Sequence, residues 1–150
     1  MPSVDPGDLA IRNLTYEQFV RGGRAPTSGE LAATSGATRN AIRASWQRLH
    51  DAHAIVLDAS SGEIRMANPF SAVATPYRVR ASGRWWYANC AWDAFGICAA
   101  LDSDGCIETT CADCGDQLRC TVSDGRPGDD DLVFHCLIPA AAWWDDIVFT

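Results

Sequence analysis

The stretch from residue 84 to residue 101 constrains the fold of this chain most strongly, because it joins a strand pattern directly to a helix pattern. It reads R-W-W-Y-A-N-C-A-W-D-A-F-G-I-C-A-A-L. The three aromatic residues at 85–87 follow a polar Ser-Gly turn and predict a strand. Asn89 predicts the start of a helix over residues 90–101, because an Asn side chain accepts hydrogen bonds from the free amides of a first helical turn.

Cys90 and Asp93 are three residues apart at the start of this predicted helix, so they share one face. The positive end of the helix dipole favours a thiolate at Cys90, which makes the sulfur a better nucleophile and a better ligand for soft metals. Desolvation by the aromatic neighbours would let Asp93 hold a proton. The two residues would then form a reactive pair. The alternative is inert packing, because free cysteine is among the most buried residue types.

The cysteine content points to thiol chemistry in a reducing compartment. Seven cysteines occur in 150 residues, and the N-terminus lacks the basic and apolar segments of a secretory signal peptide. An odd number of cysteines without such a signal fits reduced thiols for metal or redox chemistry better than a disulfide framework. No apolar run in the sequence approaches the ~20 residues of a membrane span. We therefore expect a cytoplasmic protein with no membrane partner.

The first 70 residues have the pattern of a winged helix-turn-helix lobe. We expect a poorly ordered arm within residues 1–13 and a short helix within residues 9–20. Thr27 or Ser28 would cap the next helix, and Thr38 would cap a longer one that ends near residue 52. Two short strands around a D-A-S-S-G turn would form the wing.

The arginines of this lobe allow two interpretations, DNA binding or a structural role. The longer helix carries Arg39, Arg43 and Arg48, which makes DNA binding conceivable. The alternative is a solvated basic face on a structural lobe. The chain has twelve basic residues, all arginine, against nineteen acidic ones, and its net charge of -7 favours that alternative. We therefore expect no nucleic-acid partner.

The second half of the chain reads as a small sheet around one helix. Pro69 and Pro76 stiffen an extended bridge, which places a domain boundary near residue 70. The sequence predicts a hairpin before the helix and three strands after it, over residues 106–110, 117–122 and 132–138. This order predicts an α+β fold: a winged-helix-like lobe over residues 1–70, then a mostly antiparallel sheet core with one central helix over residues 71–150.

A C-A-D-C-G turn carries Cys111 and Cys114. Two cysteines at this spacing are typical of a zinc knuckle, because the turn directs both thiolates at one point. A closed structural site needs two more ligands, and no second C-x-x-C motif exists to supply them. A redox pair or two unlinked thiols are the alternatives. The candidates for the missing ligands are Cys106, Cys120, His135 and Cys136.

The segment N-C-A-W-D-A-F-G-I resembles the first catalytic motif of the organomercurial (alkylmercury) lyase family. In that family a Cys-Ala-x-Asp turn supplies one mercury-binding thiolate and the proton-delivering aspartate, and Cys90 and Asp93 match these two positions. The resemblance covers roughly residues 28–150 and continues through T-T-C-A-D-C-G and W-W-D-D-I-V-F-T. The family carries a winged-helix-like N-terminal lobe on its catalytic core, and the cysteine that matches Cys111 usually has a structural role.

The resemblance implies protonolysis of a carbon–mercury bond in a small organomercurial, with Hg(II) as the product metal and no required cofactor. Soft Hg(II) prefers two near-linear thiolates. Asp93 would take a proton from a cysteine and pass it to the carbon, which leaves a hydrocarbon. An apolar wall for the organic group would come from aromatic residues whose alternative role is core packing: Trp85, Trp86, Trp92 and Phe95.

One family element is absent from this sequence. In the family the segment that resembles W-W-D-D-I-V-F-T is followed directly by the second mercury-binding cysteine. Here the sequence ends at Thr150, after an apolar strand pattern at residues 147–149. We expect either a truncated chain or a short member that lost this thiolate, with weaker mercury capture and slower turnover. Cys98 and Cys136 are the nearest spare thiols, and neither occupies the matching position.

Two other functions stay open at this stage. One is a thiol-rich metal-binding or metal-sensing winged-helix protein, which would need arginines along the exposed face of the helix over residues 38–52. The other is a family scaffold that performs a different reaction on a small molecule.

Overall fold

The computed structural model describes residues 5–128 and 131–149. Its first lobe begins with three helices: α1 (Pro6–Gly22), α2 (Ser28–Ser35) and α3 (Arg39–Asp51). The side chain of Asp5 accepts a hydrogen bond from the backbone N–H of Gly7 at 2.8 Å, so α1 begins at Pro6. The prediction of a poorly ordered arm as far as residue 13 is therefore wrong from residue 6 onward, and residues 1–4 lie outside the described residues.

The predicted caps of the next two helices are confirmed. Thr27 caps α2 in a capping box, in which its hydroxyl accepts from the N–H of Glu30 while the Glu30 carboxylate accepts from the N–H of Thr27. The Thr38 hydroxyl accepts from the N–H of Ala41 and starts α3. Local side-chain chemistry thus sets the two helices that a winged-helix lobe needs.

A small antiparallel sheet follows the helices in the order β1-β2-β3. Its strands are β1 (Val56–Leu57), β2 (Ile64–Ala67) and β3 (Phe70–Ser71). The turn between β1 and β2 is closed by Asp58, whose carboxylate accepts from the N–H groups of Ser60 and Ser61. Three helices followed by this sheet have the order that a winged-helix lobe requires, and that assignment stays a prediction.

The second lobe is built on a five-stranded antiparallel sheet with the order β5-β4-β6-β7-β8. The helix α4 (Ala91–Ala100) packs against β4 and β6. The predicted α+β class is therefore confirmed. The strands are β4 (Arg78–Ala81), β5 (Arg84–Tyr87), β6 (Gly105–Thr110), β7 (Gln117–Ser123) and β8 (Arg126–Pro127).

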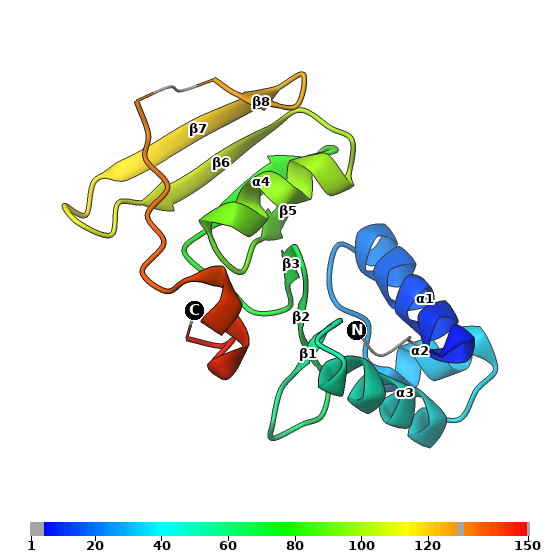
Figure 1. Ribbon diagram of the computed structural model, residues 1–150. Coiled ribbons are helices and arrows are strands. Elements are labelled where there is room, and N and C mark those ends of the chain that lie inside the picture. The colour runs from blue at the N-terminus through cyan, green and yellow to red at the C-terminus, as the bar shows by residue number, and fades with distance from the viewer. Residues whose placement is uncertain (1–4, 129–130, 150) are drawn as a thin grey trace.

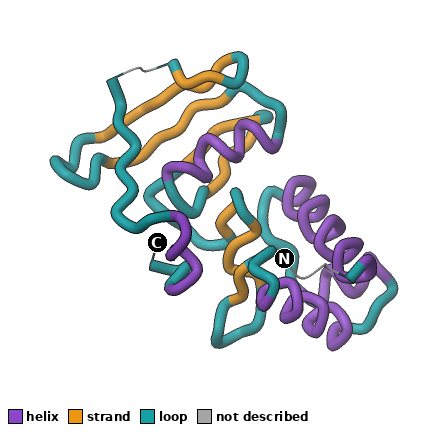
Figure 2. Tube along the Cα trace, in the orientation of Figure 1, coloured by secondary structure: helices purple, strands orange, loops and turns teal. Residues whose placement is uncertain are grey.

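The predicted strand over residues 132–138 is wrong. The strand beside β7 is β8, and residues 131–139 run as a loop up to the 3-10 helix η1 (Ala140–Asp145), as Figure 2 shows. Residues 147–149 are also not a strand, because they form a turn in which the N–H of Phe149 donates to the carbonyl of Asp146 at 3.1 Å. The segment 131–149 is thus free of the sheet and lies near the start of α4 (Figure 1).

Three aromatic rings connect the two lobes. Phe70 of β3 packs against Phe19 of α1, with 5.3 Å between ring centroids, and against Trp86 of β5, with 5.1 Å. All three side chains are buried within one hydrophobic cluster that includes residues of both lobes. The division of the chain into two domains near residue 70 therefore stays a prediction. No helix in the described residues is long and apolar enough to cross a membrane.

Candidate active site

Cys90 itself caps α4, which corrects the prediction that Asn89 is the cap. The backbone of Cys90 is extended, with φ −150° and ψ −178°, and its sulfur accepts a hydrogen bond from the N–H of Asp93 at 3.5 Å. Asn89 instead donates from Nδ2 to the Asp93 carboxylate at 2.9 Å. The first turn of α4 thus brings together the thiol and the carboxyl that the sequence places three residues apart.

The bridge between the lobes holds this turn in place. The Asn89 Nδ2 also lies 3.1 Å from Oδ1 of Asn68, and Asn68 precedes Pro69 in a cis peptide bond. Gly96 of α4 approaches the same bridge so closely that a Cβ added there would lie 3.1 Å from the Cβ of Pro69. A side chain at position 96 would therefore push α4 away from the bridge, and with it the Cys90 and Asp93 pair.

Burial raises the pKa of the Asp93 carboxyl above its usual value, and the hydrogen bond from Asn89 opposes that shift. A carboxylate that loses water loses the solvation of its charge, so the protonated form is favoured. Asp93 can therefore hold a proton at a higher pH than an exposed aspartate.

Burial also raises the pKa of the Cys90 thiol. The N–H of Asp93 opposes this shift, and the negative charge of Asp93 adds to it. The prediction that the helix dipole lowers the pKa of Cys90 is therefore wrong, because desolvation outweighs the first-turn amides. A thiolate at Cys90 requires transfer of its proton to a base or replacement of that proton by a metal.

Cys90 and Asp93 line a cavity of about 400 Å³. Its wall is formed by the first turn of α4, by residues of the first lobe and bridge, and by the segment 131–149. The polar groups are few beside a mainly hydrophobic lining, which suits a small apolar ligand. The apolar side chains of the wall are Met66, Tyr77, Ala91, Trp92, Ala112, Phe134, Leu137, Ile138, Trp143, Ile147, Val148 and Phe149.

Three of the four aromatic residues expected in this wall lie elsewhere. Trp86 is in the core, where its Nε1 donates to the carbonyl of Ala81, and Trp85 is exposed, with the Arg78 guanidinium 4.4 Å from its ring centroid. Phe95 lines a separate hollow. Only Trp92 lines the cavity, because strand alternation and helical rotation carry the others to different faces.

The segment after the sheet supplies the aromatic residues that the sequence analysis missed. The Phe134 ring packs against Trp92, with 6.1 Å between centroids and an interplanar angle of 59°. The Nε1 of Trp143 and the thiol of Cys136 both donate to the carbonyl of Ile138, at 2.8 and 2.9 Å. The apolar run over 132–138 was the available signal, and it also fits a strand.

Cys136 is the second thiol of the cavity. It lines the same walls as Cys90 and Asp93, and its charge acts on the pKa of Cys90. Cys98, the other spare thiol, is buried on α4 and lines the separate hollow of about 620 Å³. The structure therefore brings one of the two spare cysteines to the site and leaves the other outside it.

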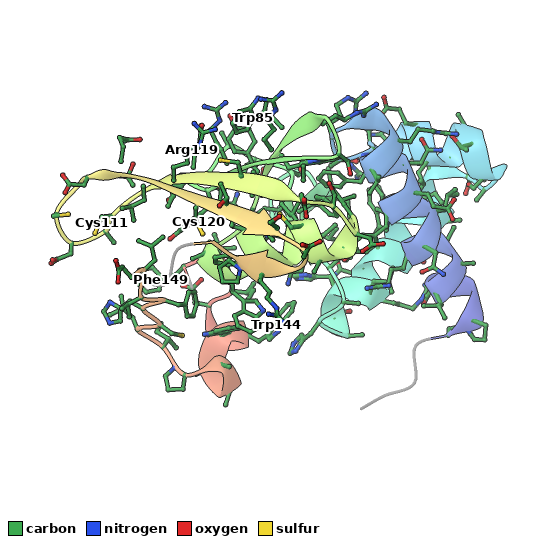
Figure 3. All side chains as sticks on the ribbon, turned by 90° about the horizontal axis from the view of Figure 1, so that it is seen from above. Trp85, Cys111, Arg119, Cys120, Trp144 and Phe149 are labelled. Carbon is green, nitrogen blue, oxygen red and sulfur yellow. The ribbon has the colours of Figure 1, made fainter. Side chains whose placement is uncertain are left out.

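The C-A-D-C turn lies at the end of the β6–β7 hairpin, where Figure 3 shows Cys111 at the tip. Cys120 is buried further along β7, and the sulfur of Cys106 accepts from Nε of Arg119 at 2.9 Å. Within residues 5–128 and 131–149, no group of three or more His, Cys, Asp or Glu side chains could hold a metal ion. A closed four-ligand zinc site at Cys111 and Cys114 is therefore absent from this part of the chain.

Comparisons with known proteins agree with this geometry. Residues 70–150 match the family model described as MerB, alkylmercury lyase. Among solved structures, the crystal structure of the mercury-bound form of MerB2 is similar, with a TM-score of 0.68 and 24% sequence identity over 85% of this chain. This identity shows a shared fold, and the match spans 61% of that protein's chain. No curated protein matches the sequence.

Proposed function

The chain belongs to the alkylmercury lyase family, and on this premise we propose that it cleaves the carbon–mercury bond of a small organomercurial by protonolysis. One observation carries the proposal: Cys90 and Asp93 meet at the wall of a cavity of about 400 Å³ that is otherwise mainly apolar. The apolar walls accommodate the organic group. The thiol binds the metal, and the carboxyl protonates the carbon.

Capture begins at Cys90. The Cys90 sulfur displaces a weaker ligand from the organomercury cation and forms an S–Hg bond, and its proton passes to the carboxylate of Asp93. The raised pKa of Asp93 favours this transfer, because the buried carboxyl holds a proton better than an exposed one. The raised pKa of Cys90 does not prevent capture, since mercury replaces the proton.

Cleavage uses the same proton. Electron donation from the thiolate weakens the carbon–mercury bond and places negative charge on the carbon. Asp93 then protonates that carbon, the hydrocarbon leaves, and Hg(II) stays on the protein. Asn89 holds the carboxyl through its 2.9 Å hydrogen bond, which keeps the acid directed at the metal-bound carbon.

Cys136 supplies the second thiolate in this proposal. Hg(II) prefers two thiolates, and Cys136 shares the cavity with Cys90. The packing of Phe134 on Trp92 holds the Cys136 segment against the first turn of α4. A second S–Hg bond further weakens the carbon–mercury bond and retains the product, and the proton of Cys136 leaves with the ligand that Cys90 displaced.

The alternative of a metal-sensing DNA-binding protein needs arginines on the exposed face of α3, and Arg39 and Arg48 are exposed there, although both are paired. Arg39 and Arg43 pair with Glu63 of the wing at 3.4 and 2.9 Å, and Arg48 forms two hydrogen bonds with the buried carboxylate of Asp8. Each of the three arginines therefore already has a carboxylate partner within the lobe. These pairs support a structural role for α3 over nucleic-acid recognition.

We also propose a cytoplasmic location, which would keep the seven free thiols reduced.

Release of the hydrocarbon tests the proposal. The chain is incubated with phenylmercury acetate and a small thiol, and benzene in the headspace is measured by gas chromatography. The matched control is the same chain after alkylation of its thiols with N-ethylmaleimide. We expect benzene from the untreated chain only. Absence of benzene, or equal release by the alkylated chain, would contradict the proposed function.

A further inference from the structure

The turn between β6 and β7 carries two free thiols, Cys111 and Cys114, outside the catalytic pair. The backbone closes the turn through two hydrogen bonds, from the N–H of Gly115 to the carbonyl of Cys111 at 3.0 Å and from the N–H of Cys111 to the carbonyl of Asp116 at 2.8 Å. Cys114 is exposed and Cys111 is half-buried. Both sulfurs are therefore accessible and held at the end of a regular hairpin.

The two thiols of the turn differ from Cys90 in the direction of the pKa shift at one sulfur. The N–H groups of Cys114 and Asp113 and the Cys114 side chain direct hydrogen bonds at the Cys111 sulfur, and they lower the pKa of its thiol. Amide donors around a sulfur favour its anionic form. The same arrangement occurs in the first turn of α4, but there burial outweighs it.

The number of ligands selects the metal. Zinc takes four ligands in a structural site, and the described residues bring no third His, Cys, Asp or Glu to this turn. Two thiolates are too few for a closed zinc site, whereas soft Hg(II) is satisfied by two. A turn with only two thiolates therefore suits Hg(II) better than zinc.

The turn also adjoins the cavity. Ala112, between the two cysteines, lines the same walls as Cys90, Asp93 and Cys136. We propose that Cys111 and Cys114 form a second mercury(II) site, a two-thiolate acceptor at the edge of the cavity that receives the inorganic product. The binding of Hg(II) follows from the two thiols of the turn, and only the source of the metal rests on the proposed function.

The transfer is a ligand exchange without oxidation or reduction. The Cys111 and Cys114 sulfurs form two S–Hg bonds as the bonds to Cys90 and Cys136 break. The protons of the two acceptor thiols pass to the two sulfurs that are released. The cavity returns to its starting state and can accept another substrate, while the turn presents Hg(II) to solvent and to external thiols.

Binding is tested with mercuric chloride on the full chain. The cavity site is first disabled by Cys90→Ser, and the protein is passed through a desalting column in excess monothiol. Two thiols on one turn bind as a chelate and resist a monothiol competitor. We expect the Cys90→Ser chain to retain one Hg(II), and the chain that also carries Cys111→Ser and Cys114→Ser to retain none. Cys106→Ser, a half-buried thiol of the same hairpin, is the matched control and should leave retention unchanged.

Transfer is tested by counting turnovers without added thiol. The wild-type chain should release two hydrocarbon molecules per chain, and the Cys111→Ser/Cys114→Ser chain should release one at an unchanged first-turnover rate. Equal retention of Hg(II) with and without the two turn cysteines would overturn the site. Equal turnover numbers would overturn the transfer. A chain that cleaves no organomercurial but keeps the turn-dependent Hg(II) would contradict the proposed function and leave the second site standing.

Discussion

The cavity and the C-A-D-C turn use the same side chain in opposite ways. At Cys90 the sulfur accepts from a helix amide, yet burial raises the pKa of its thiol. At Cys111 backbone amides also donate to the sulfur, but the turn is open to solvent and the pKa is lowered. The comparison teaches that amide donors at a cysteine do not set its pKa alone, because desolvation can reverse their effect.

The difference assigns separate tasks to the two regions. The cavity has an acid beside its thiol and a mainly apolar lining, which suits bond cleavage. The turn has the more acidic thiol and lies at an exposed hairpin end, which suits metal storage and release. The cysteine with the lower pKa is thus not the one that we place at the chemical step.

The largest effect that separates the two regions is expected from Cys90→Ser. Loss of this thiolate removes the first mercury ligand beside Asp93, so hydrocarbon release should fall below detection. Cys111→Ser/Cys114→Ser should keep the first-turnover rate. Rapid-quench measurement of benzene from phenylmercury acetate compares them. If both variants lose activity equally, the separation of tasks is wrong.

A smaller effect is expected from Cys136→Ser. Without the second thiolate of the cavity, Hg(II) is held by Cys90 alone, and retention against a monothiol should weaken by about 100-fold. Competition with glutathione in the Cys111→Ser/Cys114→Ser background, where the turn no longer retains Hg(II), followed by mercury analysis of the protein, measures this change. Cys98→Ser serves as the control, because Cys98 lies outside the cavity. Stronger loss in the control would show that Cys98 supplies the second thiolate.

The opposite pKa shifts predict an order of alkylation. The thiolate of Cys111 forms at lower pH than the thiolate of Cys90, so Cys111 should react first with iodoacetamide as the pH is raised. Peptide mass spectrometry across a pH series gives the rate at each cysteine. Faster alkylation of Cys90 at every pH would contradict the prediction that the Cys111 thiol has the lower pKa.

The smallest effect concerns the thermal stability of the chain, which depends on the ionisation of the buried Asp93 carboxyl. The pKa of Asp93 is raised in the folded chain, so burial of its charge costs free energy once the carboxyl ionises. The stability contributed by the neutral acid is present below the ordinary pKa of 3.8 and is lost as the pH rises through the folded pKa. Asp93→Asn should therefore unfold at a higher temperature than the wild type at pH 7, with the difference closing near pH 3. Thermal melts at the two pH values measure it, and a constant difference would contradict the shift.

Local rules predicted the parts of the site that depend on neighbours in sequence. Helical spacing was enough to bring Cys90 and Asp93 together, and the caps at Thr27 and Thr38 follow from side chains within three residues. Asn89 was misassigned as the cap because its partners include Asn68, which is distant in sequence and reaches it only through the bridge between the lobes.

The cavity wall could not be predicted in the same way. The apolar run over 132–138 fits a strand, but β8 already occupies the place beside β7, and Phe134 packs on Trp92 instead. The sequence is equally compatible with Trp86 in the cavity wall, but the Trp86 ring packs against Phe70 in the core. These outcomes depend on tertiary packing, which periodicity does not encode.

The most direct test of the central claim is the fate of the carbon and the metal in Asp93→Asn. In heavy water the wild-type chain should release benzene that carries one deuterium from phenylmercury acetate and keep Hg(II). The variant should bind phenylmercury through Cys90, as intact protein mass shows, and release benzene about 10²- to 10⁴-fold more slowly, because a positioned acid contributes that factor. Deuterated benzene released by the variant at the wild-type rate would contradict the assignment of Asp93 as the proton donor and, with it, the proposed mechanism.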